Sequence, residues 1–381
     1  MNLALLVFLV SAVLVVYVVG LYPALLALGV FRKAPPVAAR PVWRTVSLLL
    51  PVRNGERWIR AKLESIFALD YPPELLEVIV ISDGGRDRTE EIARSFPRVR
   101  LLVIPPSGKA AALNAGMREA AGEILFFTDV RQPLDPPSLK ALVAQFSDPT
   151  VGVSSGELII RRGVTAEEER VGLYWRYEKL IRKQHSRIDS VLGATGAIYA
   201  MRRELARPLP PDCLLDDVHL PFLAFFRGYR IVFVEEALAY DDPTGLQTEF
   251  RRKVRTLAGV YQLIGRFPAL LTPRNRMWWH FLSHKFGRLL LPFALLALLA
   301  SSALLPAPWS AALLAVQGAF YGLAALDPWA PEGSRLKPLS SLARTFAALM
   351  LASLAAASYV FLPSEWFWKT PSGPQPDRSA G

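Results

Sequence analysis

The N-terminal stretch of residues 3–30 constrains the fold most, because it is almost wholly apolar. It is longer than the roughly 20 residues that a helix needs to cross a bilayer, and it therefore predicts a transmembrane helix. A cleaved signal peptide is the alternative, but no basic region precedes the run, and the run exceeds the short apolar core of such peptides. Positive charge after it predicts an N-terminus outside and following residues in the cytosol. The basic residues are Arg32, Lys33, Arg40 and Arg44.

Three further apolar stretches occur late in the chain, at about 289–305, 311–326 and 342–362. The middle one is short for a span, and a re-entrant segment is its alternative. Four spans in total return the C-terminus to the outside and place the loop with Arg335 and Lys337 inside, as its positive charge predicts. The chain of 381 residues is 52% hydrophobic and 20% charged, which is typical of a soluble domain combined with membrane segments.

The formal net charge is +11, but lysine and arginine are spread through the middle of the chain and beside the apolar spans. A nucleic-acid-binding protein gathers them in one stripe, so the pattern argues against a nucleic-acid partner. We interpret the positive charge as facing anionic lipid headgroups and phosphates. The single cysteine, Cys213, excludes an intramolecular disulfide and a cysteine-rich metal site, which suits a reducing cytosolic face.

Strand-like and helix-like stretches alternate in the middle of the chain. The predicted strands are 46–52, 77–82, 99–104, 123–128 and 151–160, and the predicted helices are 56–67, 89–95 and 109–121. Apolar residues recur at three-and-four spacing in the helices, whereas the strands are short apolar runs. This order predicts an α/β fold, in which βαβ units build a mostly parallel sheet with its ligand at the carboxyl ends of the strands.

Polar residues suited to a phosphate-bearing ligand stand at the ends of two of these strands and at the start of one helix. Asp129 follows the apolar run 124–127 and is able to hold Mg²⁺ or Mn²⁺ together with substrate phosphates. Asp83 is placed to accept hydrogen bonds from a nucleobase or ribose, and Lys109 stands near a helix N-terminus, where it would meet a phosphate. The plainer alternatives are a turn or helix cap for Asp129, a turn for Asp83 and a solvated surface position for Lys109.

Four motifs recur at the predicted strand ends. They are Pro51-Val52-Arg53-Asn54-Gly55-Glu56, Ser82-Asp83-Gly84 followed by Thr89, Gly108-Lys109 leading to Ala112-Leu113-Asn114-Ala115-Gly116, and Phe127-Thr128-Asp129. In order and spacing they resemble the GT-A domain of membrane-bound family 2 glycosyltransferases, a group that includes cellulose, chitin and hyaluronan synthases. The resemblance implies a Rossmann-like, mostly parallel α/β domain in the cytosol, flanked by transmembrane helices in the inner membrane of a bacterial cell.

The resemblance also implies a nucleotide-sugar donor, with UDP as the expected nucleotide. The implied donor-binding residues are Pro51, Arg53, Asn54, Glu56, Asp83, Lys109 and Asp129. Among them Asp83 would bind the nucleotide, and Asp129 would hold Mg²⁺ or Mn²⁺ on the diphosphate. The family pattern at the metal site is Asp-x-Asp, but the third position here is Arg131. Metal binding is then weaker or completed by another group, while Arg131 neutralises phosphate charge or points to solvent.

Two later motifs are similar to the family's acceptor side and base. The glycine-punctuated stretch 193–203, which contains Thr195 and Gly196, resembles the acceptor segment. Further on, Asp216-Asp217 stands where the family has Glu-Asp. The resemblance implies that Asp217 takes the proton of the acceptor hydroxyl and that Asp216 adjusts the pKa of Asp217 by like-charge repulsion. The alternative is an aspartate pair that caps a helix beginning near Val218.

The segment 248–259 stands in the place of the family's Gln-x-x-Arg-Trp motif. Arg255 matches the arginine, which implies a contact with the leaving diphosphate. Arg252 replaces the glutamine, and Thr256 replaces the tryptophan that helps to receive a growing polymer, although Tyr261 is a shifted aromatic. These changes favour transfer of one or a few sugars. A basic amphipathic helix on the inner leaflet is the other interpretation, and both can hold at once.

Together these patterns divide the chain into six parts. We predict a transmembrane helix at 1–31, a linker at 32–45, a cytosolic GT-A domain at 46–245, interfacial amphipathic helices at 246–284, three transmembrane helices at 285–364 and a disordered tail at 365–381. The implied activity is inverting transfer of a sugar to a hydroxyl of a lipid-linked or polysaccharide acceptor, in contact with membrane lipids. A processive synthase and a catalytically weakened binding or assembly subunit are the alternatives, and each allows partner subunits.

Overall fold

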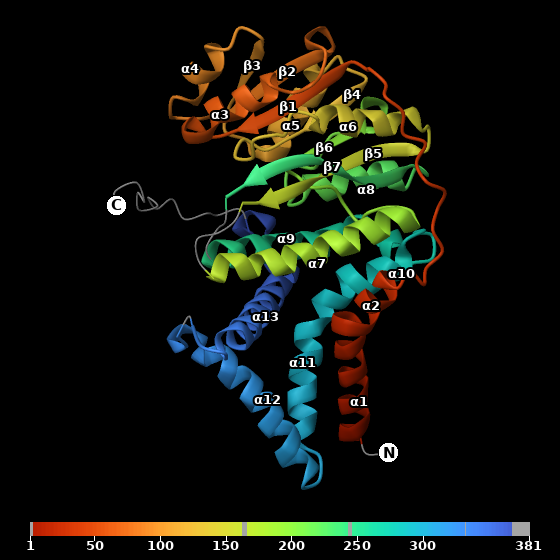
Figure 1. Cartoon of the computed structure of the whole chain (residues 1–381), viewed down its shortest axis with the longest axis vertical. Helices are drawn as coiled ribbons and strands as arrows, with labels where there is room; N and C mark the ends of the chain where they lie inside the picture. Colours follow the sequence, from red (N-terminus) through yellow and green to blue (C-terminus); the bar gives the residue numbers. More distant parts are fainter. Residues whose placement is uncertain (1–2, 162–165, 243–245, 332, 368–381) are drawn as a thin grey trace.

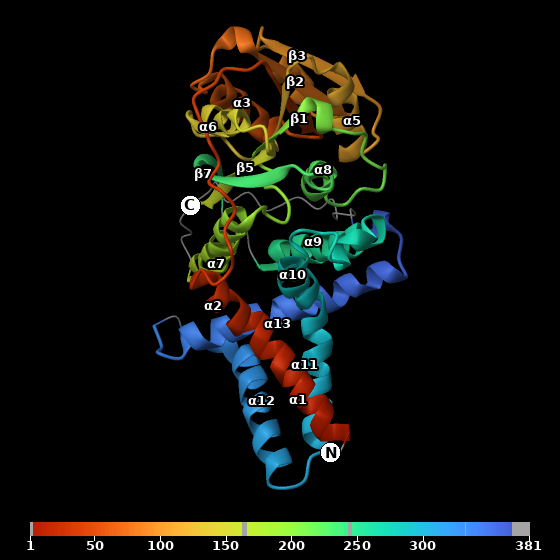
Figure 2. The ribbon, with the colours of Figure 1, turned by 90° about the vertical axis from the view of Figure 1, so that its right-hand side faces the viewer.

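The computed structural model describes residues 3–161, 166–242, 246–331 and 333–367. A domain built on one sheet forms one end of the molecule, and a group of long apolar helices forms the other (Figure 1). Helices α7 (Ala166–Ile188) and α9 (Leu246–Arg266) lie between these two parts in both views (Figures 1 and 2). Most of the predicted disordered tail, from 368 to 381, falls outside the described residues.

Within the described residues, seven strands form one sheet in the order β3-β2-β1-β4-β6-β5-β7. Their bounds are β1 Val46–Val52, β2 Leu76–Asp83, β3 Val99–Ile104, β4 Ile124–Phe127, β5 Val151–Ile160, β6 Tyr199–Arg202 and β7 Arg230–Asp241. Strands β3, β2, β1 and β4 are parallel to one another, whereas β6 runs antiparallel to both β4 and β5. The prediction of an α/β fold with a mostly parallel sheet is confirmed, and β6 and β7 complete it.

Two apolar cores cover the two faces of the sheet. The surrounding helices are α3 (Glu56–Phe67), α4 (Thr89–Arg94), α5 (Lys109–Glu119), α6 (Ser138–Ala144) and α8 (Asp216–Phe225). Successive residues of a strand point to opposite faces, so Leu49 packs with α5 and α8, whereas Leu48 and Leu50 pack with α3 and α6. Burial on both faces explains why β1 reads as a continuous apolar run.

In the described part of the chain, four helices are long and apolar enough to cross a membrane. They are Leu3–Ala27, Trp278–Ala303, Trp309–Trp329 and Lys337–Val360, built from α1 (Leu3–Val16), α2 (Tyr22–Ala27), α10 (Trp278–His280), α11 (Gly287–Ala303), α12 (Trp309–Leu326) and α13 (Lys337–Ala356). Their number agrees with the sequence prediction. The second begins at Trp278 because a π-helical turn over Phe281–Phe286 continues into α11. Helix α13 crosses beneath α9, obliquely to α11 and α12 (Figure 2).

A buried polar cluster joins the first two apolar helices to α7. The hydroxyl of Tyr22 lies 2.7 Å from Nε2 of His185 and 3.0 Å from Nδ1 of His280. All three side chains are buried. Buried polar groups are costly unless they are paired, so this cluster stabilises one particular arrangement of α2, α7 and α10.

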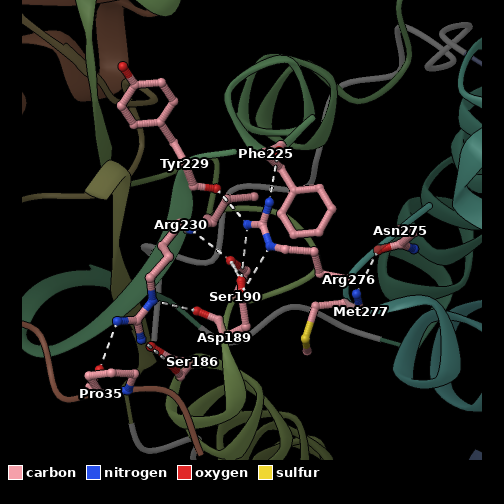
Figure 3. Close-up of polar contacts among 11 residues, drawn as sticks. Pro35, Ser186, Asp189, Ser190, Phe225, Tyr229, Arg230, Asn275, Arg276 and Met277 are labelled. Carbon is pink, nitrogen blue, oxygen red and sulfur yellow. Dashed lines mark hydrogen bonds and ion pairs between the residues drawn. The ribbon is translucent and has the colours of Figure 1, made fainter. Parts of the chain in front are cut away.

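Two arginines join the sheet domain to the start of the second apolar helix (Figure 3). Arg276 pairs through Nε with Oδ2 of Asp189 at 3.0 Å, and its Nη1 donates to the carbonyl oxygen of Phe225 at 3.1 Å. Arg230 donates to the carbonyl oxygen of Asp189 at 3.0 Å and to that of Pro35 at 2.9 Å. The end of α7, the end of α8, β7 and the linker before β1 therefore share one hydrogen-bonded network.

We expect R276A to lower the melting temperature of the detergent-solubilised full-length protein. The change removes the donors that satisfy Asp189 and the Phe225 carbonyl, and such a loss costs about 1–2 kcal/mol. Tryptophan fluorescence during heating measures the effect. The matched control is R274A, because Arg274 is exposed and makes no hydrogen bond or ion pair with the described residues. Equal melting temperatures for the two variants would contradict a stabilising role for the network.

Candidate functional site

The carboxyl ends of β1, β2 and β4 open into a pocket of about 710 Å³. Six of the residues predicted to bind the donor or the acceptor line it, together with Arg131, Gln132 and Cys213. These six are Pro51, Arg53, Asp83, Lys109, Asp129 and Arg252. These side chains come from strand ends and a helix start that the parallel pairing brings to one edge, so the structure gathers them at one pocket, and their roles in binding stay predictions.

Asp83 ends β2 and holds the loop that precedes α5. Its Oδ1 accepts hydrogen bonds from the backbone N–H groups of Ser107 at 2.6 Å and Gly108 at 3.1 Å. The next residue, Gly84, turns the chain with a φ of +62°, and a Cβ there would lie 2.8 Å from the backbone nitrogen of Pro106. Only glycine fits that turn without strain. Asp83 thus lines the pocket and shapes its loop, and its contact with a nucleotide stays a prediction.

Asn54 and Glu56, two predicted donor-binding residues, connect the loop after β1 to the loop after β2. Asn54 adopts a φ of 52°, and its Oδ1 accepts the backbone N–H of Arg86 at 2.9 Å. Oε2 of Glu56 accepts the backbone N–H of Arg88 at 3.1 Å. Both side chains are used to join two loops at the rim, while the predicted residues before them line the pocket.

Lys109, the first residue of α5, lies between two carboxylates. Its Nζ is 2.9 Å from Oδ1 of Asp129 and 3.2 Å from Oδ1 of Asp216. Burial lowers the pKa of Lys109, but Asp129, Asp216 and Asp217 raise it more, so the pKa lies above its ordinary value and the ammonium stays charged. The sequence placed Lys109 at a phosphate, whereas its partners here are carboxylates. One ammonium group connects the predicted metal ligand with the predicted base motif.

Asp217 lies in the first turn of α8, beside the predicted acceptor segment. A Cβ at Gly196 would lie 3.0 Å from Oδ2 of Asp217, so the chain of that segment touches the carboxylate. Burial and then Asp216 raise the pKa of Asp217 to about 6, against the opposing effect of Lys109 and Arg255. Helix α8 begins at Asp216 and has no side-chain cap, so the capping alternative is wrong. A carboxylate with this pKa is suited to accept a proton near neutral pH.

Thr195 fixes the predicted acceptor segment to β5 through two hydrogen bonds. Thr195 donates its hydroxyl to the carbonyl oxygen of Gly156 at 2.8 Å, and its N–H donates to Oγ of Ser155 at 2.8 Å. Tyr199 of β6 stacks on Phe127 of β4 with ring centroids 4.6 Å apart. The Tyr199 hydroxyl is buried and has no hydrogen-bond partner among the described residues. Thr195 therefore positions the segment, and Tyr199 carries an unsatisfied polar group that the sequence analysis did not single out.

Lys62 is a second residue that the sequence analysis missed. It is completely buried on the apolar face of α3 and donates to Oγ1 of Thr128 at 2.6 Å and to the carbonyl oxygen of Gln132. Burial lowers the pKa of Lys62 to about 7, although the charge of Asp129 raises it. The signal in the sequence was a lysine next to Leu63 at a core-facing helix position. Lys62 holds the turn that carries Asp129.

Helix α9 lies against the loop that precedes α8. Oε1 of Gln262 accepts the N–H of Leu214 at 2.9 Å, and its Nε2 donates to the carbonyl oxygen of Asp212 at 2.8 Å. The approach is so close that a Cβ at Gly259 would lie 2.4 Å from Cγ of Leu215. Through these contacts α9 positions the residue directly before Asp216-Asp217.

Arg131 and Arg252, which both depart from the family pattern, meet at Asp241. Asp241 ends β7 and its side chain is 5% exposed. Nη2 of Arg131 lies 2.7 Å from Oδ1 and 2.6 Å from Oδ2 of Asp241, and Nη2 of Arg252 lies 3.8 Å from Oδ2. Thr256 donates its hydroxyl to the carbonyl oxygen of Arg252 at 2.8 Å. Arg131 is therefore paired rather than solvated, which corrects one of the two readings of this position.

Comparison with known proteins decides the family. The sequence model described as "Glycosyl transferase family 2" matches residues 47–209, and the one described as "Glycosyl transferase family group 2" matches residues 132–324, more than half of the chain. The chain belongs to glycosyltransferase family 2. It is 25% identical over 283 residues to the Bacillus subtilis (strain 168) protein named "Probable glycosyltransferase YdaM", covering 67% of this chain and 66% of that one.

Two further similarities agree with this assignment. An N-acetylglucosaminyltransferase of Sinorhizobium fredii is 27% identical over 303 residues, which cover 73% of each chain. The solved structure of a mannosyltransferase from Pyrobaculum calidifontis, in complex with GDP-Man and Mn²⁺, superposes with a TM-score of 0.72 at 24% identity and covers 93% of this chain and 99% of that one. The second similarity shows that this family 2 enzyme has the GT-A fold, as the sequence motifs implied.

Asp129 is the residue of the pocket of this family 2 glycosyltransferase that is suited to a divalent metal ion. Across the described residues, no group of three or more His, Cys, Asp or Glu side chains is arranged to hold a metal. Asp129 lines the pocket with its side chain 39% exposed, so it offers a carboxylate oxygen to the cavity. Mg²⁺ and Mn²⁺ commonly bind through one or two carboxylates plus substrate phosphates. A divalent ion therefore fits here only with Asp129 and the oxygens of a bound diphosphate or water.

We expect G259A to lower the melting temperature of this glycosyltransferase by a few degrees. The added methyl group would overlap Leu215, and overpacking of this kind costs about 1–3 kcal/mol. The matched control is G265A on the same helix, where a Cβ meets no atom within 4 Å. Because alanine stabilises a helix by about 1 kcal/mol over glycine, G265A should melt at the same or a higher temperature. A lower melting temperature for G265A than for G259A would contradict the close packing of α9.

Proposed function

We propose that this family 2 glycosyltransferase is an inverting enzyme that transfers a sugar from a nucleoside diphosphate to a hydroxyl of a lipid-linked or saccharide acceptor at the membrane surface. UDP is the nucleotide expected from the family resemblance. The four apolar helices support a membrane location, with the sheet domain in the cytosol and the N-terminus outside as the proposed topology. If all four crossed the membrane, the C-terminus would lie outside as well.

A single observation carries this proposal. Lys109 contacts both Asp129, which lines the pocket, and Asp216, the neighbour of Asp217. A carboxylate with a raised pKa therefore lies beside a pocket whose wall offers cations and a carboxylate for a diphosphate. That combination suits transfer from a phosphate leaving group to an oxygen nucleophile.

The proposed reaction is a single displacement. Asp217 takes the proton of the acceptor hydroxyl, and the freed oxygen attacks the anomeric carbon of the donor sugar. The new carbon–oxygen bond forms as the bond to the diphosphate breaks, and the nucleoside diphosphate leaves with the electron pair. Attack from the face opposite to the leaving group inverts the anomeric configuration. No second carboxylate nucleophile is assigned, so a two-step retaining route is not proposed.

Charge on the leaving diphosphate would be stabilised by the cations of the site. Arg255 is close enough to Asp217 to lower its pKa, which is consistent with its proposed place at the leaving group. A divalent ion held by Asp129 and the diphosphate would neutralise further charge. Exchange of the aromatic residue for Thr256 supports transfer of one or a few sugars over processive synthesis.

A catalytically weakened binding subunit is the second candidate, because Arg131 removes one of the two acids of the family's metal motif. The pairing of Lys109 with both acids argues for retained chemistry. Turnover by the purified protein separates the two candidates.

We expect the detergent-solubilised protein to release nucleoside diphosphate from one of a panel of UDP- and GDP-sugars in the presence of Mg²⁺ or Mn²⁺. Removal of the base in D217N should lower the rate by about 10²–10⁴-fold. D129N should also lower it, whereas D70N, a change at an exposed aspartate paired with Lys140, should leave it unchanged. Absence of release with every donor, with lipid supplied, would favour the binding subunit.

The pH dependence of kcat/KM should follow the Asp217 carboxyl group. Only the deprotonated form accepts a proton, so the rate should fall as the pH drops below about 6, the raised pKa of Asp217. D216N removes the like charge that contributes to this shift and should move the fall to lower pH. The measurement is a pH profile of donor turnover for both proteins. If kcat/KM of D216N fell at the same acidic pH as that of the wild type, Asp216 would not raise the pKa of Asp217.

A further inference from the structure

Helix α13 begins beside the end of α12, where the chain turns back on itself. The carbonyl oxygen of Asp327 accepts Nζ of Lys337 at 2.9 Å, and Oδ1 of Asp327 accepts the hydroxyl of Ser340 at 2.7 Å. Nη1 of Arg344, two turns into α13, lies 3.3 Å from Oδ2 of the same aspartate. Charged groups are tolerated at the polar surface of a bilayer and are costly at its centre. The start of α13 therefore lies at the bilayer surface where α12 ends.

The other end of α13 lies beside the sheet domain. The hydroxyl of Ser353 donates to the carbonyl oxygen of Arg288 at 3.1 Å, and Arg288, at the start of α11, pairs with Glu178 of α7. Ala356 is buried in the same apolar core as Leu215, the residue before α8. The last turns of α13 are thus held by elements that belong to the sheet domain or adjoin it.

The described chain beyond α13 stays at this end of the molecule. Tyr359 and Phe367 pack against the same core, with ring centroids 5.7 Å apart. Helix α11 leads away from the sheet domain, and α12 leads back toward it (Figures 1 and 2). Helix α13 then crosses beneath α9 instead of leading away again (Figure 2). Both ends of α13 therefore lie on the side of the bilayer that faces the sheet domain.

The side chains of α13 indicate what covers it. Its buried side chains are one lysine and several small residues, namely Lys337, Ser340, Ser341, Ala343, Ala352, Ser353 and Ala356. Its exposed large side chains are leucines, namely Leu339, Leu342, Leu351 and Leu354. A surface helix in water has the opposite pattern, with leucine inside and polar residues outside. Small and polar residues at helix contacts, with leucines outside, are typical of a helix in contact with lipid.

We propose that α13 does not cross the bilayer but lies along the leaflet that faces the sheet domain, with its exposed leucines among the lipid chains. The spanning segments are then Leu3–Ala27, Trp278–Ala303 and Trp309–Trp329. Three crossings leave residue 367 on the side of the sheet domain, whereas four would carry it to the opposite side. Length and hydropathy do not separate the two cases, because α13 has both properties of a span. The inference goes beyond sugar transfer and does not depend on it.

This placement brings lipid close to the proposed base. Helix α13 packs against α9, and Gln262 of α9 accepts the N–H of Leu214, just before Asp216-Asp217. The helix in contact with the leaflet at this place is thus α13, which lies between α9 and the lipid (Figure 2).

The first test labels single cysteines in the full chain with a membrane-impermeant maleimide, in intact and in permeabilised cells. The background is C213A, because Cys213 is the only cysteine. A307C, between α11 and α12, should be labelled in intact cells. S95C in the sheet domain, R335C before α13 and S372C beyond the described residues should be labelled only after permeabilisation. Labelling of S372C in intact cells together with A307C would overturn the proposal.

The second test measures depth in proteoliposomes, from the quenching of a fluorophore by lipids that carry a nitroxide at two different depths. L339C and L351C place the fluorophore at exposed positions 12 residues apart on α13. They should report similar depths if the helix lies along the leaflet. The matched control is V316C and L326C on α12, which should differ by about 15 Å, at 1.5 Å per residue. A difference of about 18 Å between the two α13 positions would show that α13 crosses the bilayer.

Discussion

The ion pairs of the Lys109 ammonium group with Asp129 and Asp216 are the interaction on which the rest of the site depends. Asp129, Asp216 and Asp217 come from the end of β4 and the start of α8, and all three influence the charge of this lysine. Carboxylates brought together out of water repel one another, and such a cluster is stable only with a compensating cation. Lys109 supplies it from the N-terminus of α5, so three separate elements meet in one charged centre.

The strand order explains why these elements meet. Strand β4 pairs in parallel with β1 on one side and antiparallel with β6 on the other. On one side the carboxyl ends of the parallel strands supply the loops proposed to bind the nucleotide, and on the other β6 brings the segment with Thr195 and Gly196 to the same edge. The proposed donor and acceptor sides therefore lie together because two kinds of strand pairing share one strand. Helix α9 supports the loop before α8 through the hydrogen bonds of Gln262 with Leu214 and Asp212.

Local patterns in the sequence were sufficient for strands β1 to β5 and for the residues that gather at the pocket, but not for β6 and β7. The bounds of β1 and α3 agree with the prediction, and Asp83, Lys109 and Asp129 line the pocket, because strand ends and helix starts depend on neighbouring residues. The partners of those residues were not predictable. Arg131 meets an aspartate 110 residues later in the chain, and periodicity carries no information on such a contact. Lys62 was missed for a different reason. A lysine in a helix is ordinarily assigned to the surface, whereas Lys62 is buried.

The contacts of Arg276 and Arg230 with Asp189 join the end of α7, β7 and the segment before α10 into one hydrogen-bonded unit (Figure 3). The apolar helices therefore do not hang on the sheet domain by flexible connections alone. Tilting the helix that begins at Trp278 relative to β7 would break charged hydrogen bonds, so the two parts should move as one body.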